Sequence, residues 1–356
     1  MLYRNDMDEV RTRLTVWWQG GDIGRPALLV HAPRTRPLEQ VPELPRPEGV
    51  TCPRYTTKSL DFRVNWNTRA CIGNEYLAEA VPTASPCLGP DCLALYLGCE
   101  SREHGDNVWF EPCIATPETA RFEYRADNFH WDFQLRLIRA LKAAGAGKFM
   151  LAFPDFIEGL DTLAAMRGTE PLLFDLIERP DWVHASLKAI TALYWRYYDT
   201  VYDLIRDDTG GSHFWVWAPG KGAKFQCDCS AMFSPDMFRE FMVPVLEEMC
   251  GRIPYSIYHW DGPGALGHHE HLLSIKALKV LQWTPGAGAE PPQHPRWWPL
   301  YHRTIDAGKK VFIHADAAGL KELKREFGPK LKQFLIGAWF RDTASANEYI
   351  RMAQVD

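Results

Sequence analysis

The second half of the chain alternates short apolar runs with longer segments of helical periodicity. This rhythm is typical of βαβ units, in which each helix returns the chain so that the next strand runs parallel to the last. A helix is predicted over residues 182–205 and another over 344–352. Ser234 and Pro235 have the residue types of a helix start, and Pro244 is predicted to kink the helix that follows. The predicted strands lie at residues 148–154, 213–217, 255–259, 278–283, 310–314 and 333–337.

Two further strands are predicted in the first half of the chain, at residues 27–31 and 78–81. Eight parallel strands can close into a barrel. We therefore expect a single α/β domain over residues 1–356 with a (β/α)8 barrel fold. An irregular N-terminal segment spans residues 1–75, and residues 76–356 form the rest of the barrel. The Pro-rich residues 33–53 and the Gly/Pro-punctuated residues 85–112 are predicted to be long loops over the barrel mouth.

Charge and composition exclude several classes of protein. The 40 basic and 45 acidic residues give a net charge of −5 without a long basic run, so nucleic-acid binding is not expected. The N-terminus lacks the apolar core of a signal peptide, and no segment reaches the ~20 apolar residues that span a bilayer. Nine dispersed cysteines do not resemble a disulfide framework. We expect a cytoplasmic protein without membrane contact, whose oligomeric state is open, a homodimer being one option.

Active sites of (β/α)8 barrels lie at the carboxyl ends of the strands. The residues at the predicted strand ends are rich in histidine and carboxylate, a composition suited to metal binding or proton transfer. These candidates are His31, Arg34, Asp91, Asp155, Glu158, Trp217, His259, Asp261, Gln282, Trp283, His314, Asp316 and Trp339.

The sharpest local feature is the segment Tyr258-His259-Trp260-Asp261-Gly262. Side chains at positions i and i+2 leave a strand on the same face, so His259 and Asp261 are expected to lie side by side. Such a pair can bind Zn²⁺, or it can transfer protons with the carboxylate orienting the imidazole. Alternatively, Asp261 caps the turn and His259 is an ordinary core residue. Spacing alone does not separate these interpretations.

Two other polar clusters have weaker patterns. Gln226-Cys227-Asp228-Cys229 lacks the Cys-x2-Cys spacing of zinc sites, so we expect Gln226 and Asp228 to face the pocket while the cysteines pack. The residues 268–271, His-His-Glu-His, are interpreted as a solvated helix end. The sequence has no phosphate-binding loop, no dinucleotide fingerprint and no serine nucleophile elbow.

Three segments together resemble the uroporphyrinogen decarboxylase superfamily, which includes corrinoid-linked methyltransferases. They are residues 234–244, 258–262 and 282–286, with fainter similarity at 88–93 and 161–168. The resemblance implies a (β/α)8 fold and one of two chemistries. Asp91 is similar to the aspartate that contacts pyrrole nitrogens in the decarboxylases, and Arg34 could replace part of their arginine loop. Their paired-arginine motif is missing.

The methyltransferases of this superfamily hold zinc with a His-x-Cys motif and a later cysteine, and the zinc activates a thiol acceptor. His259 matches the histidine of that motif, whereas Asp261 occupies the position of the first cysteine. No cysteine follows Cys250, so a zinc site would need another ligand such as His314 or Gln282. An oxygen ligand also makes the site harder and less suited to a thiolate.

The sequence thus predicts methyl transfer involving a small polar substrate and a corrinoid protein or tetrahydrofolate. His259 and Asp261 are expected to bind a metal or polarise the substrate. An acid or base is expected from Asp91, Asp155 or Glu158. A metal-independent lyase acting on a carboxylated or sugar-like compound is the alternative, and a barrel that only binds a ligand is a third possibility. The predicted substrate-binding residues are Trp217, Gln226, Asp228, Tyr258, Trp260, Gln282, Trp283 and His314.

Overall fold

The main feature of the computed structural model, which describes residues 1–355, is a seven-stranded sheet in the order β2-β1-β13-β12-β11-β10-β9. All neighbouring strands are parallel except the edge strand β2, which is antiparallel to β1. The expected α/β class with a parallel sheet is therefore confirmed. The strands are β1 (Ala27–Pro33), β2 (Asn74–Ala78), β9 (Gly222–Gln226), β10 (Tyr255–Asp261), β11 (Val280–Thr284), β12 (Lys310–His314) and β13 (Phe334–Trp339).

Within residues 1–355, the strands do not join into the closed barrel that the sequence predicts. β3 (Thr83–Ala84) and β6 (Met150–Leu151) form a separate parallel pair, and β7 (Ser212–Phe214) and β8 (Val216–Ala218) form a hairpin. Single backbone hydrogen bonds bridge the breaks: the N–H of Glu79 donates to the carbonyl of Leu28 (2.8 Å), and that of Phe153 to His213 (2.9 Å). The sheet remains open because these contacts do not extend into ladders.

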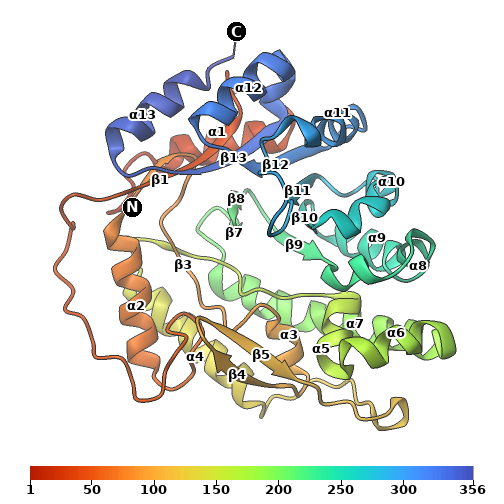
Figure 1. Ribbon diagram of the computed structural model, residues 1–356. Coiled ribbons are helices and arrows are strands. Elements are labelled where there is room, and N and C mark those ends of the chain that lie inside the picture. Colours follow the sequence, from red (N-terminus) through yellow and green to blue (C-terminus); the bar gives the residue numbers. More distant parts are fainter. Residues whose placement is uncertain (356) are drawn as a thin grey trace.

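The helices lie outside the strands and follow one another around them in chain order, from α2 at the left of Figure 1 to α13 at the top. No helix among residues 1–355 is both long and apolar enough to cross a lipid bilayer. The helices are α1 (Met7–Trp18), α2 (Leu60–Gly73), α3 (Cys92–Tyr96), α4 (Phe129–Ala144), α5 (Gly159–Arg167), α6 (Thr169–Glu178), α7 (Pro180–Ile205), α8 (Pro235–Phe241), α9 (Val243–Arg252), α10 (His269–Ser274), α11 (Trp298–Asp306), α12 (Ala317–Phe327) and α13 (Thr343–Met352).

Local chemistry explains the break between α8 and α9. The side chain of Ser234 accepts a hydrogen bond from the N–H of Met237 (3.3 Å) and so caps the start of α8. Pro244 has no N–H to donate to the preceding turn, and the helix is interrupted at Met242. The kink predicted at Pro244 is therefore present, as a boundary between two short helices.

Four predictions for segments of the chain were wrong. The expected strand at residues 213–217 is split between the two strands of the β7–β8 hairpin, and the strand beside β10 is instead β9. Residues 78–81 are not a parallel strand, because β2 ends at Ala78. The segment 1–75 holds two long helices, and residues 85–112 contain α3 and a hairpin of β4 (Glu100–His104) with β5 (Asn107–Glu111).

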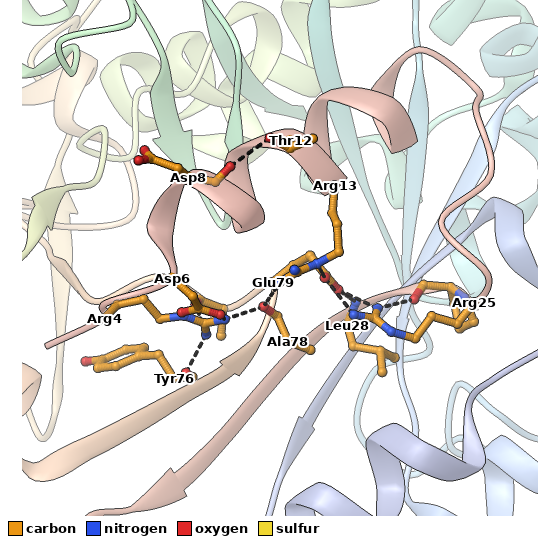
Figure 2. Close-up of polar contacts among 12 residues, drawn as sticks. Arg4, Asp6, Asp8, Thr12, Arg13, Arg25, Leu28, Tyr76, Ala78 and Glu79 are labelled. Atoms are coloured by element: carbon orange, nitrogen blue, oxygen red, sulfur yellow. Dashed lines mark hydrogen bonds and ion pairs between the residues drawn. The ribbon is translucent and has the colours of Figure 1, made fainter. Parts of the chain in front are cut away.

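A buried carboxylate ties the N-terminal helix to the sheet. Glu79, which is 0% exposed, accepts hydrogen bonds from both terminal nitrogens of Arg25 (2.7 and 2.8 Å) and from the Nε of Arg13 (2.7 Å). It also accepts one from the N–H of Leu28 (2.8 Å). Figure 2 shows these groups converging from α1, β1 and the turn after β2. The network replaces ladder contacts where the main sheet ends.

Candidate active site

The inward face of β9, β10 and β11 carries a row of polar side chains. Gln226, His259 and Gln282 are register neighbours across the three strands. Since side chains alternate between the faces of a strand, Asp261 shares the inward face with His259. Asp228 follows β9 directly and continues the same row at the open rim.

Three of these residues could hold a metal ion. Asp228, His259 and Asp261 each offer a ligand atom, and these atoms all lie within 4.8 Å of one another. Such a set, one imidazole nitrogen and two carboxylate oxygens, suits a borderline or hard divalent cation such as Zn²⁺. His259 and Asp261 lie on β10, and Asp228 lies in the turn that follows the adjacent strand β9.

The imidazole of His259 is oriented by a neighbouring amide. The Nε2 of Gln282 donates to the hydroxyl of Thr284 (2.8 Å), which turns the Gln282 oxygen toward Nδ1 of His259. In the tautomer that is protonated at Nδ1, this oxygen accepts the hydrogen bond, and Nε2 keeps a free lone pair. Burial, and then the positive charge of Lys224, lower the pKa of His259, so the ring is neutral at pH 7. A neutral imidazole held by a second hydrogen bond is typical of metal-binding histidines.

The described residues do not fully neutralise the negative charge of Asp228 and Asp261. Gln226 donates to Asp228 (2.9 Å) and to Asp161 (3.2 Å). Although Asp228 reaches solvent, burial of its carboxyl and then the charge of Asp161 raise its pKa to about 7. One oxygen of Asp261 is buried without a hydrogen-bond partner. A divalent cation would satisfy that oxygen and relieve the repulsion.

A second possible ligand group, formed by Asp161, Cys227 and Cys229, is better explained as a structural clamp. The carboxylate of Asp161 accepts hydrogen bonds from the backbone N–H groups of Asp228 (2.7 Å) and Cys229 (3.0 Å). Burial raises the pKa of Cys227 to about 11, so its thiol stays protonated. Asp161, which the sequence did not single out, therefore holds the turn that presents Asp228.

Two adjoining cavities open beside this row. One has a volume of about 340 Å³ and is lined by His259, Gln282, Thr284 and His314 among others. The other, of about 530 Å³, reaches Asp155. Both are bordered by the same four side chains, so they form one space that extends from His259 to Asp155. The shared residues are Leu29, His31, Trp215 and Trp339.

The side chains that border both cavities are uncharged, and three of the four are aromatic rings. The ring of Trp339 stacks on His31 at 5.8 Å between centroids and lies 4.9 Å from His314. Burial lowers the pKa of His31 to about 4 and also lowers the pKa of His314. Trp215 lies 5.7 Å from the ring of His259 and adopts a left-handed φ of 60° at the tip of the β7–β8 hairpin. Strain of this kind often marks functional sites.

A buried ion pair lies at the Asp155 end of the space. Lys224, which is 2% exposed, extends inward from β9 and places its Nζ 2.6 Å from Oδ1 of Asp155. Burial alone would lower the pKa of Lys224, but the charge of Asp155 reverses the shift and keeps the lysine protonated. Burial raises the pKa of Asp155, and Lys224 opposes that rise. Sequence reasoning missed Lys224 because β9 was not predicted.

Replacing Lys224 with methionine is expected to raise the pKa of Asp155 further, because burial would then act without an opposing charge. If ionised Asp155 serves as a base, the acidic limb of the pH–activity profile moves to higher pH. Comparison of kcat/KM profiles for wild type and Lys224→Met measures this shift. Lys221→Met, which removes a lysine that pairs with Asp199 instead, is the control and should leave the profile unchanged.

Asp91 and Glu158 occupy supporting positions outside the lining of both cavities. Glu158 is fully buried and accepts a hydrogen bond from the N–H of Gln226 (2.9 Å). Asp91 caps α3 by accepting from the N–H of Ala94 (2.9 Å). Burial raises the pKa of Asp91 to about 7 and raises that of Glu158 well above its ordinary value. Their geometry assigns them to holding the site together.

The aromatic residues expected as walls of the pocket lie elsewhere. Tyr258, Trp260 and Trp283 alternate with the inward residues, so they face the helices, where Trp260 stacks on His269 at 4.5 Å. Trp217 donates its indole N–H to Asp207 (2.9 Å) and packs under α1. None of these four lines either cavity. The two-residue period of a strand could have excluded Trp260 and Trp283 once His259 was placed inward.

Gly337 provides a test of packing at the floor of the site. A Cβ at this position of β13 would lie 2.6 Å from Nε2 of His314, so Gly337→Ala must displace the imidazole. We expect the free energy of unfolding to fall by ~1–3 kcal/mol, the usual effect of overpacking. Chemical denaturation measures this loss. Gly73→Ala is a matched control because its Cβ would meet no atom within 4 Å.

No protein-family model matches the sequence, and no curated protein matches it either. Among solved structures, the chain is similar to a methyltransferase from Methanosarcina mazei, with a TM-score of 0.59. The alignment covers 97% of this chain and 96% of the methyltransferase, at 11% sequence identity. The two chains therefore share an α/β fold over nearly their whole length.

Proposed function

We propose that the protein is a metal-dependent enzyme that transfers a methyl group, distantly related to the corrinoid-linked methyltransferases of the uroporphyrinogen decarboxylase superfamily. The observation that carries this proposal is the convergence of Asp228, His259 and Asp261 beside a cavity that His259 lines. The fold shared with a methyltransferase supports it. We also propose that residues 1–356 form one domain.

A divalent cation held by these three residues would supply Lewis-acid chemistry to the group that gives or accepts the methyl. With two oxygen ligands and one nitrogen ligand, the site favours a small polar substrate that binds through oxygen or nitrogen rather than through a soft thiolate. Gln282 orients His259, and Gln226 orients Asp228. The neutral rings of His31 and His314 would hydrogen-bond the substrate, and the rings of Trp215 and Trp339 would offer flat apolar contact to it. A corrinoid protein or tetrahydrofolate would be the methyl carrier.

Two measurements test this proposal. Elemental analysis of protein purified after zinc-replete expression should find one bound divalent metal per chain. Methyl transfer should then be detectable with methylcobalamin or methyltetrahydrofolate as donor, and it should disappear after chelation and return when the metal is restored. Protein that binds no metal, or turnover unaffected by chelation, would contradict the proposal.

One observation favours a second candidate, a lyase that works without a metal. Asp155 lines the larger cavity and is paired with a buried lysine, as a proton-transferring carboxylate in a decarboxylase or elimination enzyme could be. Loss of turnover in Asp155→Asn, with full activity retained in Asp261→Asn, would support the lyase. The reverse result would support methyl transfer.

A further inference from the structure

The larger cavity borders an unusual buried cation. Arg63 on α2 is 0% exposed, and no carboxylate within residues 1–355 forms an ion pair with it. Its guanidinium donates to the carbonyls of Thr56 (3.0 Å) and Cys87 (2.7 Å), while its Nε has no partner. Burial lowers the pKa of Arg63 to about 10, so it remains charged at neutral pH. A buried charge of this kind calls for a nearby anion.

The groups around Arg63 that can ionise are thiols and a phenol rather than carboxylates. They include the pair Cys87 and Cys92, whose sulfur atoms are 3.7 Å apart. Each sulfur accepts a backbone hydrogen bond, Cys87 from Asp155 (3.3 Å) and Cys92 from Leu88 (3.4 Å). Cys87 lines the cavity, whereas Cys92 is fully buried behind it. The other ionisable neighbours of Arg63 are Cys52 and Tyr55, whereas the carboxylate of Asp155 acts on Cys87.

Opposing effects set the protonation state of the Cys87–Cys92 pair. The hydrogen bond from the Cys92 thiol lowers the pKa of Cys87, whereas burial raises the pKa of Cys92 well above its ordinary value. The thiol of Cys87 donates to the carbonyl of Gly89 (2.8 Å), and the negative charge of Asp155 raises the pKa of Cys87. Arg63 and the two backbone donors favour one negative charge shared by the pair. Such a coupled pair titrates as a unit.

We propose that Cys87 and Cys92 form a reactive dithiol in the cavity wall, which takes small disulfides as its oxidants. Cys87 is the attacking member because it faces the cavity, and Cys92 is the resolving member because its sulfur lies in contact behind it. A thiol that lines a cavity, with a resolving thiol in contact behind it, is an arrangement suited to redox-sensitive cysteines. The inference is independent of the metal site.

The reaction proceeds in two exchange steps. The thiolate of Cys87 attacks one sulfur of the small disulfide, and the other sulfur leaves as a thiolate that takes a proton from water. The sulfur of Cys92 loses its proton and attacks the mixed disulfide at Cys87, which expels the second small thiol. The two protein thiols are thereby oxidised to one disulfide, and one small disulfide is reduced to two thiols.

The experiment uses 2-hydroxyethyl disulfide with the full chain in a Cys113→Ser background, since Cys113 is exposed and would react by itself. Non-reducing peptide mapping by mass spectrometry should find a Cys87–Cys92 disulfide, while the buried Cys71 and Cys250 stay unmodified. In Cys92→Ser, a stable mixed disulfide should accumulate at Cys87. In Cys87→Ser, Cys92 should remain free.

Arg63→Met tests the source of the charge. We expect the rate at Cys87 to fall by about tenfold or more at pH 7, because the thiolate loses its counter-ion. Circular dichroism checks whether Arg63→Met folds. If it does not fold, the different products expected for Cys92→Ser and Cys87→Ser still test the proposal. Two results would overturn the proposal: modification of Cys87 no faster than that of Cys71 and Cys250, or equal reactivity of Cys92 after Cys87 is replaced.

Discussion

If the proposed function is correct, replacing His259 with alanine is expected to abolish stoichiometric metal binding and metal-dependent methyl transfer. The two carboxylates that remain, Asp228 and Asp261, lack the neutral nitrogen ligand and repel each other. Even changes behind metal ligands cost about 10–100-fold in affinity, so loss of a ligand should exceed ~100-fold. Isothermal titration calorimetry, in which Zn²⁺ is added to the apo-protein, measures the change in zinc affinity.

Two variants separate ligand loss from general damage to the site. Gln282→Leu removes the partner of Nδ1 but keeps the ligand, so zinc affinity should fall by only about 10–100-fold. His314→Ala removes an imidazole that lines the same cavity but belongs to no ligand group among the described residues. Its zinc affinity should be unchanged, although its KM should rise. Unaltered zinc binding in His259→Ala would show that the metal, if bound, lies elsewhere.

The parts of the fold that could be predicted from sequence are those where apolar periodicity is strong. β10, β12 and β13 have apolar cores and were placed within a few residues, and the same-face relation of His259 and Asp261 follows from strand geometry. β9 could not be found in this way, because its inward positions hold Lys224 and Gln226. A strand that builds a polar site loses the hydrophobic signal by which strands are recognised.

The site residues that the sequence did not predict depend on long-range contacts or on backbone conformation. Asp161 lies on α5, 67 residues before Asp228, and only the fold brings its carboxylate to that turn. Trp215 enters the cavity wall because a hairpin turn holds it at positive φ, which no composition pattern indicates. The open sheet, which stands in place of the predicted closed barrel, has a similar origin. Its breaks fall at β3, β6, β7 and β8, which are two or three residues long and pair with one another instead of with the main sheet.

Glu79→Gln is expected to lower the free energy of unfolding by ~3–5 kcal/mol, because it leaves Arg25 buried without its counter-ion. Burial alone would raise the pKa of Glu79, but hydrogen bonds from Arg25, Leu28 and Arg13 outweigh it, and the net shift is downward. The ionised form therefore stabilises the protein above the ordinary carboxyl pKa, and this contribution is lost as the pH falls through the lowered value. Urea unfolding across that acidic range measures both effects.

The double variant Arg25→Met/Glu79→Leu supplies the decisive comparison. Removing both charges leaves no buried ion unpaired, so the double variant should be less destabilised than Glu79→Gln alone. Arg13→Gln should cost less than Arg25→Gln, since the side chain of Arg13 is 31% exposed and that of Arg25 is 7% exposed. A free energy of unfolding for Glu79→Gln within ~0.5 kcal/mol of wild type would contradict a stabilising role for the buried Glu79–Arg25 ion pair, because changes of that size are typical of surface positions. Additive losses in the double variant would instead mean that the two residues act separately, and that the connection between α1 and β1 depends on packing rather than on this ion pair.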